Sequence, residues 1–224
     1  MLISKDDNLF CRYAEHILLS CFPKEEVRLV AGTVGDPLDK ELKWCRPEYL
    51  VSFLSPWIIP AELLQTARTA AINFHPGSPD YPGSGCYNFA LYENAARYGV
   101  TCHHMQPKVD SGDIVMTSYF DVGEWDTVET LKLKSMNHLL LCFERVVSLI
   151  AAGRPLPLSE EKWRRKPFTR KEMYQLFEID PAACDTAEVQ KRIRAAAYPS
   201  CKGAYTVIGD TRFYVDTEDR PPIV

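Results

Sequence analysis

Two short stretches near the middle of the chain carry an amide, an imidazole and a carboxylate. Asn73 and His75 stand in the run Asn-Phe-His-Pro-Gly, and Asp110 follows 35 residues after His75 in the run Asp-Ser-Gly-Asp. The amide can donate to a developing oxyanion, and the imidazole can move a proton near neutral pH. The carboxylate can orient the imidazole and bias its protonation. Together these groups are suited to acyl transfer.

Each stretch also has an ordinary structural explanation. Asn73 and His75 could form hydrogen bonds within a turn, and Asp-Ser-Gly at 110–112 is common turn chemistry. The first two residues are two apart on a predicted strand, so their side chains share one face and Phe74 lies on the other. The acyl-transfer hypothesis therefore depends on whether that face and Asp110 meet in space.

Strand-like and helix-like patterns alternate over the first 120 residues. They predict an α/β fold with a Rossmann-like, mostly parallel sheet. In such a sheet ligands bind beyond the carboxyl ends of the strands, where the loop after His75 lies. The strands are expected at 1–4, 26–34, 49–54, 70–75, 99–105 and 114–122, and the helices at 7–21, 60–66 and 86–96.

The second half predicts a long helix and a small appendage. Residues 126–129 form a predicted capping box for an amphipathic helix that ends at Gly153. Two short helices, near 169–177 and 186–197, precede a hairpin that turns at Gly209-Asp210. This tail is too small for a large core, so it should pack on the main domain or on a partner subunit. The predicted organisation is a catalytic domain at 1–153, a linker at 154–168 and a small α+β C-terminal appendage, a helix and hairpin unit, at 169–224.

Composition and charge narrow the class of protein. The chain is 46% hydrophobic and 25% charged, as expected for a globular protein, with a net charge of -4. Proteins that bind nucleic acid usually carry a basic excess, and the dense basic cluster at 163–166 is either a solvated linker or a phosphate-binding patch. The eight cysteines lack metal-ligand spacing, so neither a metal nor a disulfide framework is expected. With no signal-peptide pattern and no membrane-length apolar run, we predict a cytoplasmic protein without a membrane partner.

The acyl-transfer residues belong to a longer pattern of fixed order and spacing. Its members are Ile72-Asn73-Phe74-His75-Pro76, Gly99-Val100-Thr101, His103, Asp110, Gly112 and Ile114. With its seven-residue interval from His103 to Asp110, the pattern resembles the formyltetrahydrofolate-dependent formyltransferase family. The resemblance is strong over about residues 45–120. It implies the formyltransferase fold and N10-formyltetrahydrofolate as the formyl donor.

The resemblance implies a role for each catalytic candidate. Asn73 would hold the formyl oxygen and stabilise the oxyanion, and His75 would accept or shuttle the proton of the attacking amine. Asp110 would orient His75 and balance its charge. His103 matches a family position and is expected to support the site, whereas His104 should pack or meet solvent on the opposite face.

The resemblance also implies two binding surfaces. The folate would bind in a mainly backbone-lined pocket, although residues 54–59 could instead be plain core. The loop 77–83 borders the acceptor side and lacks the Ser-Leu-Leu-Pro of many relatives, which leaves the amine open. Tyr87 and Asn88 could instead simply begin a helix. The folate candidates are Phe53, Leu54, Ser55, Trp57, Ile58, Val109, Gly112, Asp113 and Ile114. The acceptor candidates are Pro76, Gly77, Tyr81, Tyr87 and Asn88.

The sequence of the tail bears on which acceptor is predicted. Its residues Asp180, Ile193-Arg194-Ala195, Tyr198-Pro199 and Gly203-Ala204-Tyr205 resemble the C-terminal unit of transfer-RNA and sugar formyltransferases. We predict a homodimeric sugar N-formyltransferase that acts on an amino-deoxy nucleotide sugar, in lipopolysaccharide O-antigen biosynthesis. The acidic charge and short tail argue against methionyl-tRNA formyltransferase, and the complete catalytic set argues against a folate binder without turnover. Another small amine remains an open alternative.

Overall fold

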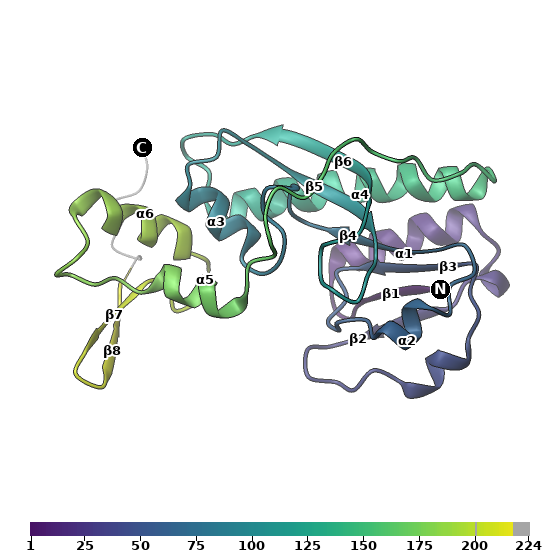
Figure 1. Ribbon diagram of the computed structural model, residues 1–224, viewed down its shortest axis with the longest axis horizontal. Helices are drawn as coiled ribbons and strands as arrows, with labels where there is room; N and C mark the ends of the chain where they lie inside the picture. Colours follow the sequence, from purple (N-terminus) through teal and green to yellow (C-terminus); the bar gives the residue numbers. More distant parts are fainter. Residues whose placement is uncertain (200, 217–224) are drawn as a thin grey trace. The chain divides into compact units, whose positions relative to one another are not determined.

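The computed structural model describes residues 1–199 and 201–216, and its main feature is a six-stranded sheet. The strand order is β2-β1-β3-β4-β5-β6 (Figure 1). The first four strands in this order pair in parallel, and β4 pairs antiparallel with β5. The predicted mostly parallel sheet is therefore confirmed. The strands are β1 (Leu2–Lys5), β2 (Leu29–Gly32), β3 (Tyr49–Phe53), β4 (Ala70–His75), β5 (Arg97–His104) and β6 (Ile114–Asp121).

The chain divides into two compact units. The first holds residues 1–82, 99–119 and 135–167, and the second holds residues 83–98, 120–134 and the chain from 168 onward. The predicted boundaries after 153 and 168 stay predictions, and the predicted end at 224 lies outside the described residues. The helices are α1 (Leu9–Cys21), α2 (Ala61–Leu64), α3 (Cys86–Tyr92), α4 (Val128–Ala151), α5 (Arg170–Phe177) and α6 (Thr186–Ala196), with short 3-10 helices η1 (Lys24–Glu26) and η2 (Lys40–Trp44). Over the described residues, no helix combines the length and apolar character needed to cross a membrane.

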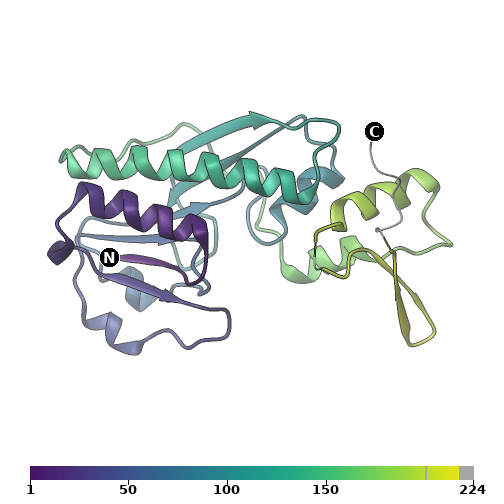
Figure 2. The same ribbon diagram turned by 180° about the vertical axis from the view of Figure 1, so that it is seen from behind.

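The core of the first unit lies on both faces of β3 and β4. Phe53 and Phe74 contact Phe143 of α4, with ring centroids 5.2 and 4.9 Å apart, on the face that α1 also covers (Figure 2). On the other face Leu50 belongs to a cluster with Leu63 of α2. Because side chains alternate along a strand, burial of Phe74 places its neighbours at 73 and 75 on the opposite face. β3 is therefore buried on both faces.

Two predicted boundaries and one predicted cap are wrong for local reasons. β2 is shorter than 26–34, because η1 precedes it and a turn closed by Asp36, which accepts from the Thr33 amide, follows it. α3 ends at Tyr92 instead of residue 96, since Asn94 has a left-handed φ of 53° that helices do not continue through. The capping box at 126–129 does not form. Thr127 and Thr130 exchange hydrogen bonds there, each hydroxyl accepting from the other's amide.

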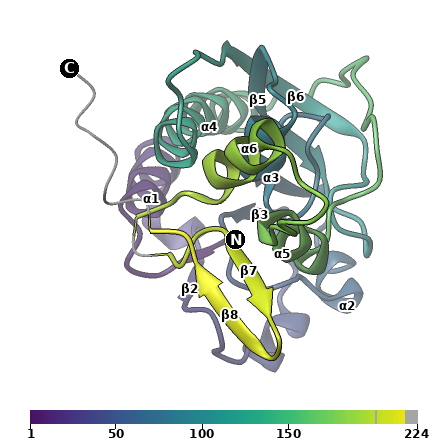
Figure 3. The ribbon, with the colours of Figure 1, turned by 90° about the vertical axis from the view of Figure 1, so that its left-hand side faces the viewer.

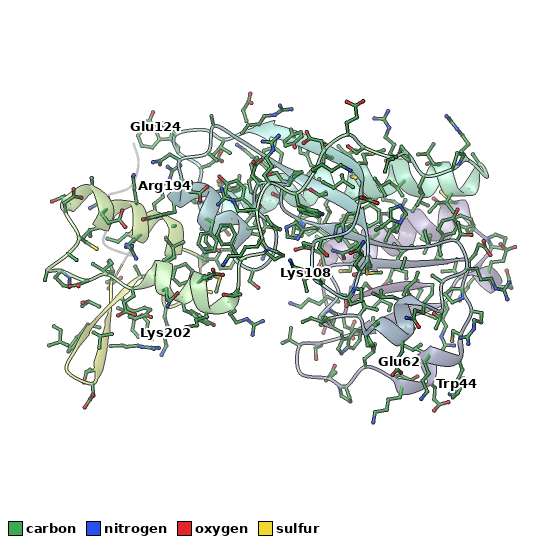
Figure 4. All side chains as sticks on the ribbon, viewed as in Figure 1. Trp44, Glu62, Lys108, Glu124, Arg194 and Lys202 are labelled. Atoms are coloured by element: carbon green, nitrogen blue, oxygen red, sulfur yellow. The ribbon has the colours of Figure 1, made fainter. Side chains whose placement is uncertain are left out.

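The second unit is built on α3 and α6. Asn88 of α3 donates to the carbonyl oxygen of Ala195 at 2.6 Å, and the Tyr92 hydroxyl donates to Glu188 at 2.7 Å. Arg194 of α6 donates to the carbonyl oxygen of Glu124 at 3.1 Å (Figure 4). The tail therefore packs on a segment that lies earlier in the chain, as predicted.

The rest of the tail follows its local sequence signals. Thr169 and Glu172 form a capping box at the start of α5, because each side chain accepts from the other's backbone amide. The strands β7 (Tyr205–Ile208) and β8 (Thr211–Tyr214) pair antiparallel (Figure 3). Gly209 has a φ of 59°, which suits the two-residue turn between them. The predicted hairpin is confirmed.

Asp126 ties the start of α4 to the loop before it. Its carboxylate is 7% exposed and accepts from the Gly123 amide, the Thr130 hydroxyl and Lys134 Nζ. Burial disfavours the charged form of this carboxylate, but the three donors outweigh burial. They hold the pKa of Asp126 below its ordinary value.

We expect Asp126→Asn to lower the free energy of unfolding by about 1–3 kcal/mol near neutral pH, because its buried donors lose a charged acceptor. Since the folded pKa is depressed, this contribution is complete above the unfolded pKa of about 3.9 and is lost as the pH falls through the folded value. Urea unfolding at several pH values should show the gap to the natural protein narrowing in acid. The side chain of Glu124 is exposed, so the control Glu124→Gln should leave the free energy of unfolding nearly unchanged. A gap that stays constant in acid would contradict this account.

Candidate active site

The antiparallel pairing of β4 and β5 places Asn73 beside a histidine. Asn73 is opposite His103 in the ladder, and Asn73 Nδ2 lies 3.2 Å from His103 Nε2. His103 Nδ1 lies 2.8 Å from the carbonyl oxygen of His104, so this nitrogen carries a proton and donates. In the neutral ring, Nε2 then accepts from the Asn73 amide. The amide nitrogen has a second N–H that this contact does not use.

Asp110 lies between two imidazoles. Its Oδ2 is 3.3 Å from His75 Nδ1, and its Oδ1 is 3.2 Å from His103 Nε2. His75, His103 and Asp110 are 6, 2 and 5% exposed. Hydrogen bonds and charge interactions are stronger in such surroundings than in water. The carboxylate therefore connects His75 to His103 and, through that ring, to Asn73.

Both ring nitrogens of His75 face hydrogen-bond acceptors. Nδ1 faces Asp110, and Nε2 lies 3.0 Å from the carbonyl oxygen of Tyr81. A neutral imidazole has one N–H and can donate to one of these groups, whereas the protonated ring can donate to both. The surroundings of His75 thus supply partners for each N–H of a ring that has accepted a proton.

The loop 77–83 determines how closely His75 can approach Tyr81. A Cβ on Gly77 would overlap His75 Nε2 and crowd the carbonyl oxygen of Tyr81. The hydroxyl of Thr101 donates to the carbonyl oxygen of Gly77 at 2.7 Å and holds the start of the loop on β5. Pro76 is half-buried and Tyr81 is buried. Gly77 and Tyr81 therefore set the position of the His75 imidazole, and their predicted contact with an acceptor stays a prediction.

Asp110 lies on a strained loop between β5 and β6. Lys108, which is labelled in Figure 4, lies on the same loop. Asp110 has a φ of 42°, a left-handed conformation that costs a residue other than glycine about 1–2 kcal/mol. Gly112 runs against β5 so closely that a Cβ would overlap the carbonyl oxygen of His104. The loop thus holds the carboxylate in a conformation that its own residues do not favour.

The segment after β3 begins beside the catalytic amide, because Ser52 pairs with Asn73 in the parallel ladder. Leu54 has a φ of 52°, so the backbone turns sharply at the carboxyl end of the strand. Phe53 is fully buried, with its carbonyl oxygen 3.8 Å from Cys11 Sγ, whereas Ile58 is 77% exposed. This segment therefore offers apolar surface next to the site.

The other folate candidates have defined partners. The Ser55 hydroxyl bonds the backbone of Trp57, and Trp57 Nε1 donates to the carbonyl oxygen of Asp36 at 2.7 Å. The Trp57 ring packs on Gly32 of β2. On the Asp110 loop, Val109 is 43% exposed, Asp113 lies 3.8 Å from Lys162 Nζ, and Ile114 is buried.

Tyr87 and Asn88 lie on α3 in the second unit, and the other candidates lie in the first. The Asn88 amide is engaged with Ala195. Burial raises the pKa of Tyr87 well above its ordinary value, and its ring lies 5.9 Å from that of Tyr98. Both side chains thus serve the packing of the second unit, and their contact with an acceptor stays a prediction.

One contributor to the site was missed by the sequence analysis. Trp163, in the predicted linker, lies with its ring centroid 5.1 Å from that of His103 and 6.0 Å from that of His75. Its Nε1 donates to the carbonyl oxygen of Gly112 at 2.8 Å. The signal available in the sequence was a lone tryptophan in a charged run. The described residues hold no group of three or more side chains arranged to bind a metal ion.

The geometry defines a class of site. An oxyanion donor, a buried imidazole and a carboxylate meet at the carboxyl end of a strand in a mostly parallel sheet, which suits acyl transfer. The formyl transferase family matches this chain over residues 12–141, more than half of its length. The chain therefore belongs to the formyl transferase family. Asn73, His75 and Asp110 lie within the matched region, whereas Trp163 lies beyond it.

Curated relatives fall into two groups. The chain is 30% identical over 140 residues to the methionyl-tRNA formyltransferase of Geobacillus thermodenitrificans (strain NG80-2), covering 60% of this chain and 43% of that protein. It is 25% identical over 178 residues to the GDP-perosamine N-formyltransferase of Brucella melitensis biotype 1, covering 77% of this chain and 66% of that protein. The chain thus spans less than two thirds of the length of either relative.

Solved structures share the fold. A sugar N-formyltransferase from Shewanella sp FDAARGOS_354 superposes with a TM-score of 0.78 at 19% identity, covering 96% of this chain and 95% of that one. An N-formyltransferase from Helicobacter canadensis, solved with folinic acid and dTDP-3-aminofucose, gives a TM-score of 0.71 at 16% identity, covering 94% of this chain and 84% of that one. These likenesses confirm the predicted formyltransferase fold.

We expect Gly112→Ala to lower the free energy of unfolding by about 1–3 kcal/mol, because the new methyl group must push the Asp110 loop away from β5. Gly123→Ala is the matched control, since its Cβ would meet Asp126 Oδ2 at an ordinary 3.6 Å. Thermal unfolding followed by circular dichroism compares the two variants. Equal stability would show that the close approach at Gly112 is not needed.

Proposed function

We propose that this chain transfers a formyl group from N10-formyltetrahydrofolate to the primary amine of an amino-deoxy nucleotide sugar. The observation that carries the proposal is the buried Asp110 carboxylate, which contacts His75 and His103 while His103 contacts Asn73. Membership of the formyl transferase family supports the reaction type. The relatives named for sugar acceptors support the substrate class.

The residues beside the triad fit a folate as the donor substrate. A pterin ring presents polar edges and flat apolar faces, which require backbone hydrogen-bonding groups and apolar walls. The backbone turns sharply at Leu54, and Ile58 and Val109 provide exposed apolar side chains on the two segments concerned. Folinic acid bound to the Helicobacter canadensis enzyme supports this choice. The donor supplies the formyl carbon that the amine attacks.

Each catalytic group then has a defined task. Asn73 donates its second amide N–H to the formyl oxygen as negative charge develops on it. His75 accepts the proton that the attacking amine loses, and Asp110 stabilises the resulting positive ring. The same proton then passes to N10 as the bond between the formyl carbon and N10 breaks and tetrahydrofolate leaves. His103 Nε2 lies next to both the Asn73 amide and the Asp110 carboxylate, so this ring fixes the two groups relative to each other. His75, His103 and Asp110 are buried, which strengthens the charge interactions among them.

The finer features belong to the same proposal. A nucleotide-sugar acceptor agrees with the net charge of -4, because transfer RNA would need an extended basic surface. GDP-perosamine and dTDP-3-aminofucose, named for two of the similar proteins, are the first acceptors to test. Such a substrate would place the enzyme in the cytoplasm and in O-antigen assembly. A homodimer is part of the same proposal.

We expect Asn73→Ala and His75→Ala each to lower kcat at least about 100-fold, because each removes a group that acts on the developing charge or on the proton. Asp110→Asn should lower kcat by a similar factor, since the amide keeps the shape of the side chain but removes its charge. The assay measures release of tetrahydrofolate from the formyl donor with a panel of amino-deoxy nucleotide sugars. The control His16→Ala, on the exposed face of α1, should keep full activity.

Binding of folinic acid by calorimetry separates a lost reaction step from a lost donor site. Variants that bind folinic acid normally but fail to turn over place the defect in catalysis. Normal turnover in both Asn73→Ala and His75→Ala would refute the catalytic assignment. Turnover with charged initiator transfer RNA, and none with any sugar, would refute the acceptor class and favour the methionyl-tRNA reaction.

A further inference from the structure

The segment after α4 has contacts that a solvated linker would not need. We call residues 159–165 the strap. At its start the Ser159 amide donates to the carbonyl oxygen of Ile114 at 2.9 Å, which joins the strap to the first residue of β6. The hydroxyl of Tyr119 donates to Glu161 at 3.0 Å. Burial and this hydrogen bond raise the pKa of Tyr119 to about 12, so the phenol stays a donor at any ordinary pH.

The end of the strap holds the loop 77–83. The Arg164 amide donates to the carbonyl oxygen of Pro79 at 3.0 Å, and Arg164 Nη1 lies 3.0 Å from Asp80 Oδ1. The Asp80 charge raises the pKa of Arg164, which is a sign of their attraction. The guanidinium of Arg165 lies 5.3 Å from the ring centroid of Tyr81. Two adjacent arginines thus contact the loop whose Tyr81 carbonyl faces His75.

Between these anchors, Trp163 contacts the catalytic cluster itself. Its indole meets His103 and His75 at interplanar angles of 84° and 66°, which is the edge-to-face geometry that aromatic rings prefer. Its N–H donates to the carbonyl oxygen of Gly112, two residues after Asp110. A single side chain therefore touches both imidazoles and holds the loop that carries their shared carboxylate.

We propose that Trp163 is a positioning residue for the His75–Asp110 pair, and that the strap is the element that holds this pair in its reactive geometry. The strained φ of Asp110 supports the need for such a hold, because an unrestrained loop would relax away from a left-handed conformation. The indole also covers the imidazoles with an apolar surface, which strengthens their interaction with the carboxylate. The catalytic part of this proposal depends on the proposed function, but the hold on the loop does not.

The kinetic test compares Trp163→Ala, Trp163→Phe and the control Trp44→Phe, whose side chain is 67% exposed in the same unit. We expect Trp163→Ala to lower kcat about 100-fold, since a small displacement of catalytic groups can cost that much, while KM for both substrates stays within about 3-fold. Trp163→Phe keeps an aromatic ring over the imidazoles but loses the N–H, so its kcat should lie between those of Trp163→Ala and the natural protein. Trp44→Phe should match the natural protein. Unchanged kcat in both Trp163 variants would overturn the proposal.

Hydrogen exchange tests the hold without any substrate. Peptides that span 105–113 should exchange faster in Trp163→Phe than in the natural protein or in Trp44→Phe. Unchanged exchange in this segment would overturn the proposal, even if kcat fell. A fall in kcat that merely follows the unfolded fraction, measured by thermal unfolding, would also overturn it. If no acceptor is formylated by the natural protein, the proposed function fails, and the exchange result alone decides whether Trp163 holds the loop.

Discussion

The Asp110 carboxylate lies between two buried imidazoles, and the geometry of the site depends on this arrangement. Its two oxygens lie 3.3 and 3.2 Å from the nitrogens of His75 and His103. A buried charge is costly unless it is paired and hydrogen-bonded, so the surrounding structure must bring these partners to it. The antiparallel register of β4 and β5 supplies the histidines. The tight path of the chain at Gly112 supplies the position of the carboxylate.

Two residues at the site adopt backbone conformations that are unfavourable for residues other than glycine. Asp110 and Leu54 both adopt left-handed conformations, and both lie on loops at the carboxyl ends of the strands. Strain of this kind persists when the surroundings determine the conformation, and it is concentrated at functional sites. The rigid part of the fold is the aromatic and aliphatic packing of β3 and β4 against α4. That packing gives the strained loops a fixed base.

Much of the fold and of the candidate site could be predicted from local sequence. Alternation along one strand correctly put Phe74 and its two polar neighbours on opposite faces, and the hairpin turn at Gly209-Asp210 followed from its residue types. The cap of α4 was missed because two threonines exchange hydrogen bonds there, a pairing that the capping-box pattern does not include. Trp163 was missed because its partner Gly112 is 51 residues away and the strap has no periodic structure to analyse. The residues next to Trp163 in the sequence give no sign of a contact with a residue so far away.

The path of the strap has an evolutionary consequence. Adjacent residues of one short segment hold two loops, the loop 77–83 and the loop that carries Asp110. A change of acceptor would usually be accommodated by remodelling the first loop, in length or in sequence. Because the strap contacts both loops, such a change would also displace the strap and, through it, the Asp110 carboxylate. New specificity in this lineage would therefore arise through paired changes, in which the loop 77–83 and residues 163–165 diverge together while the reactive residues stay the same.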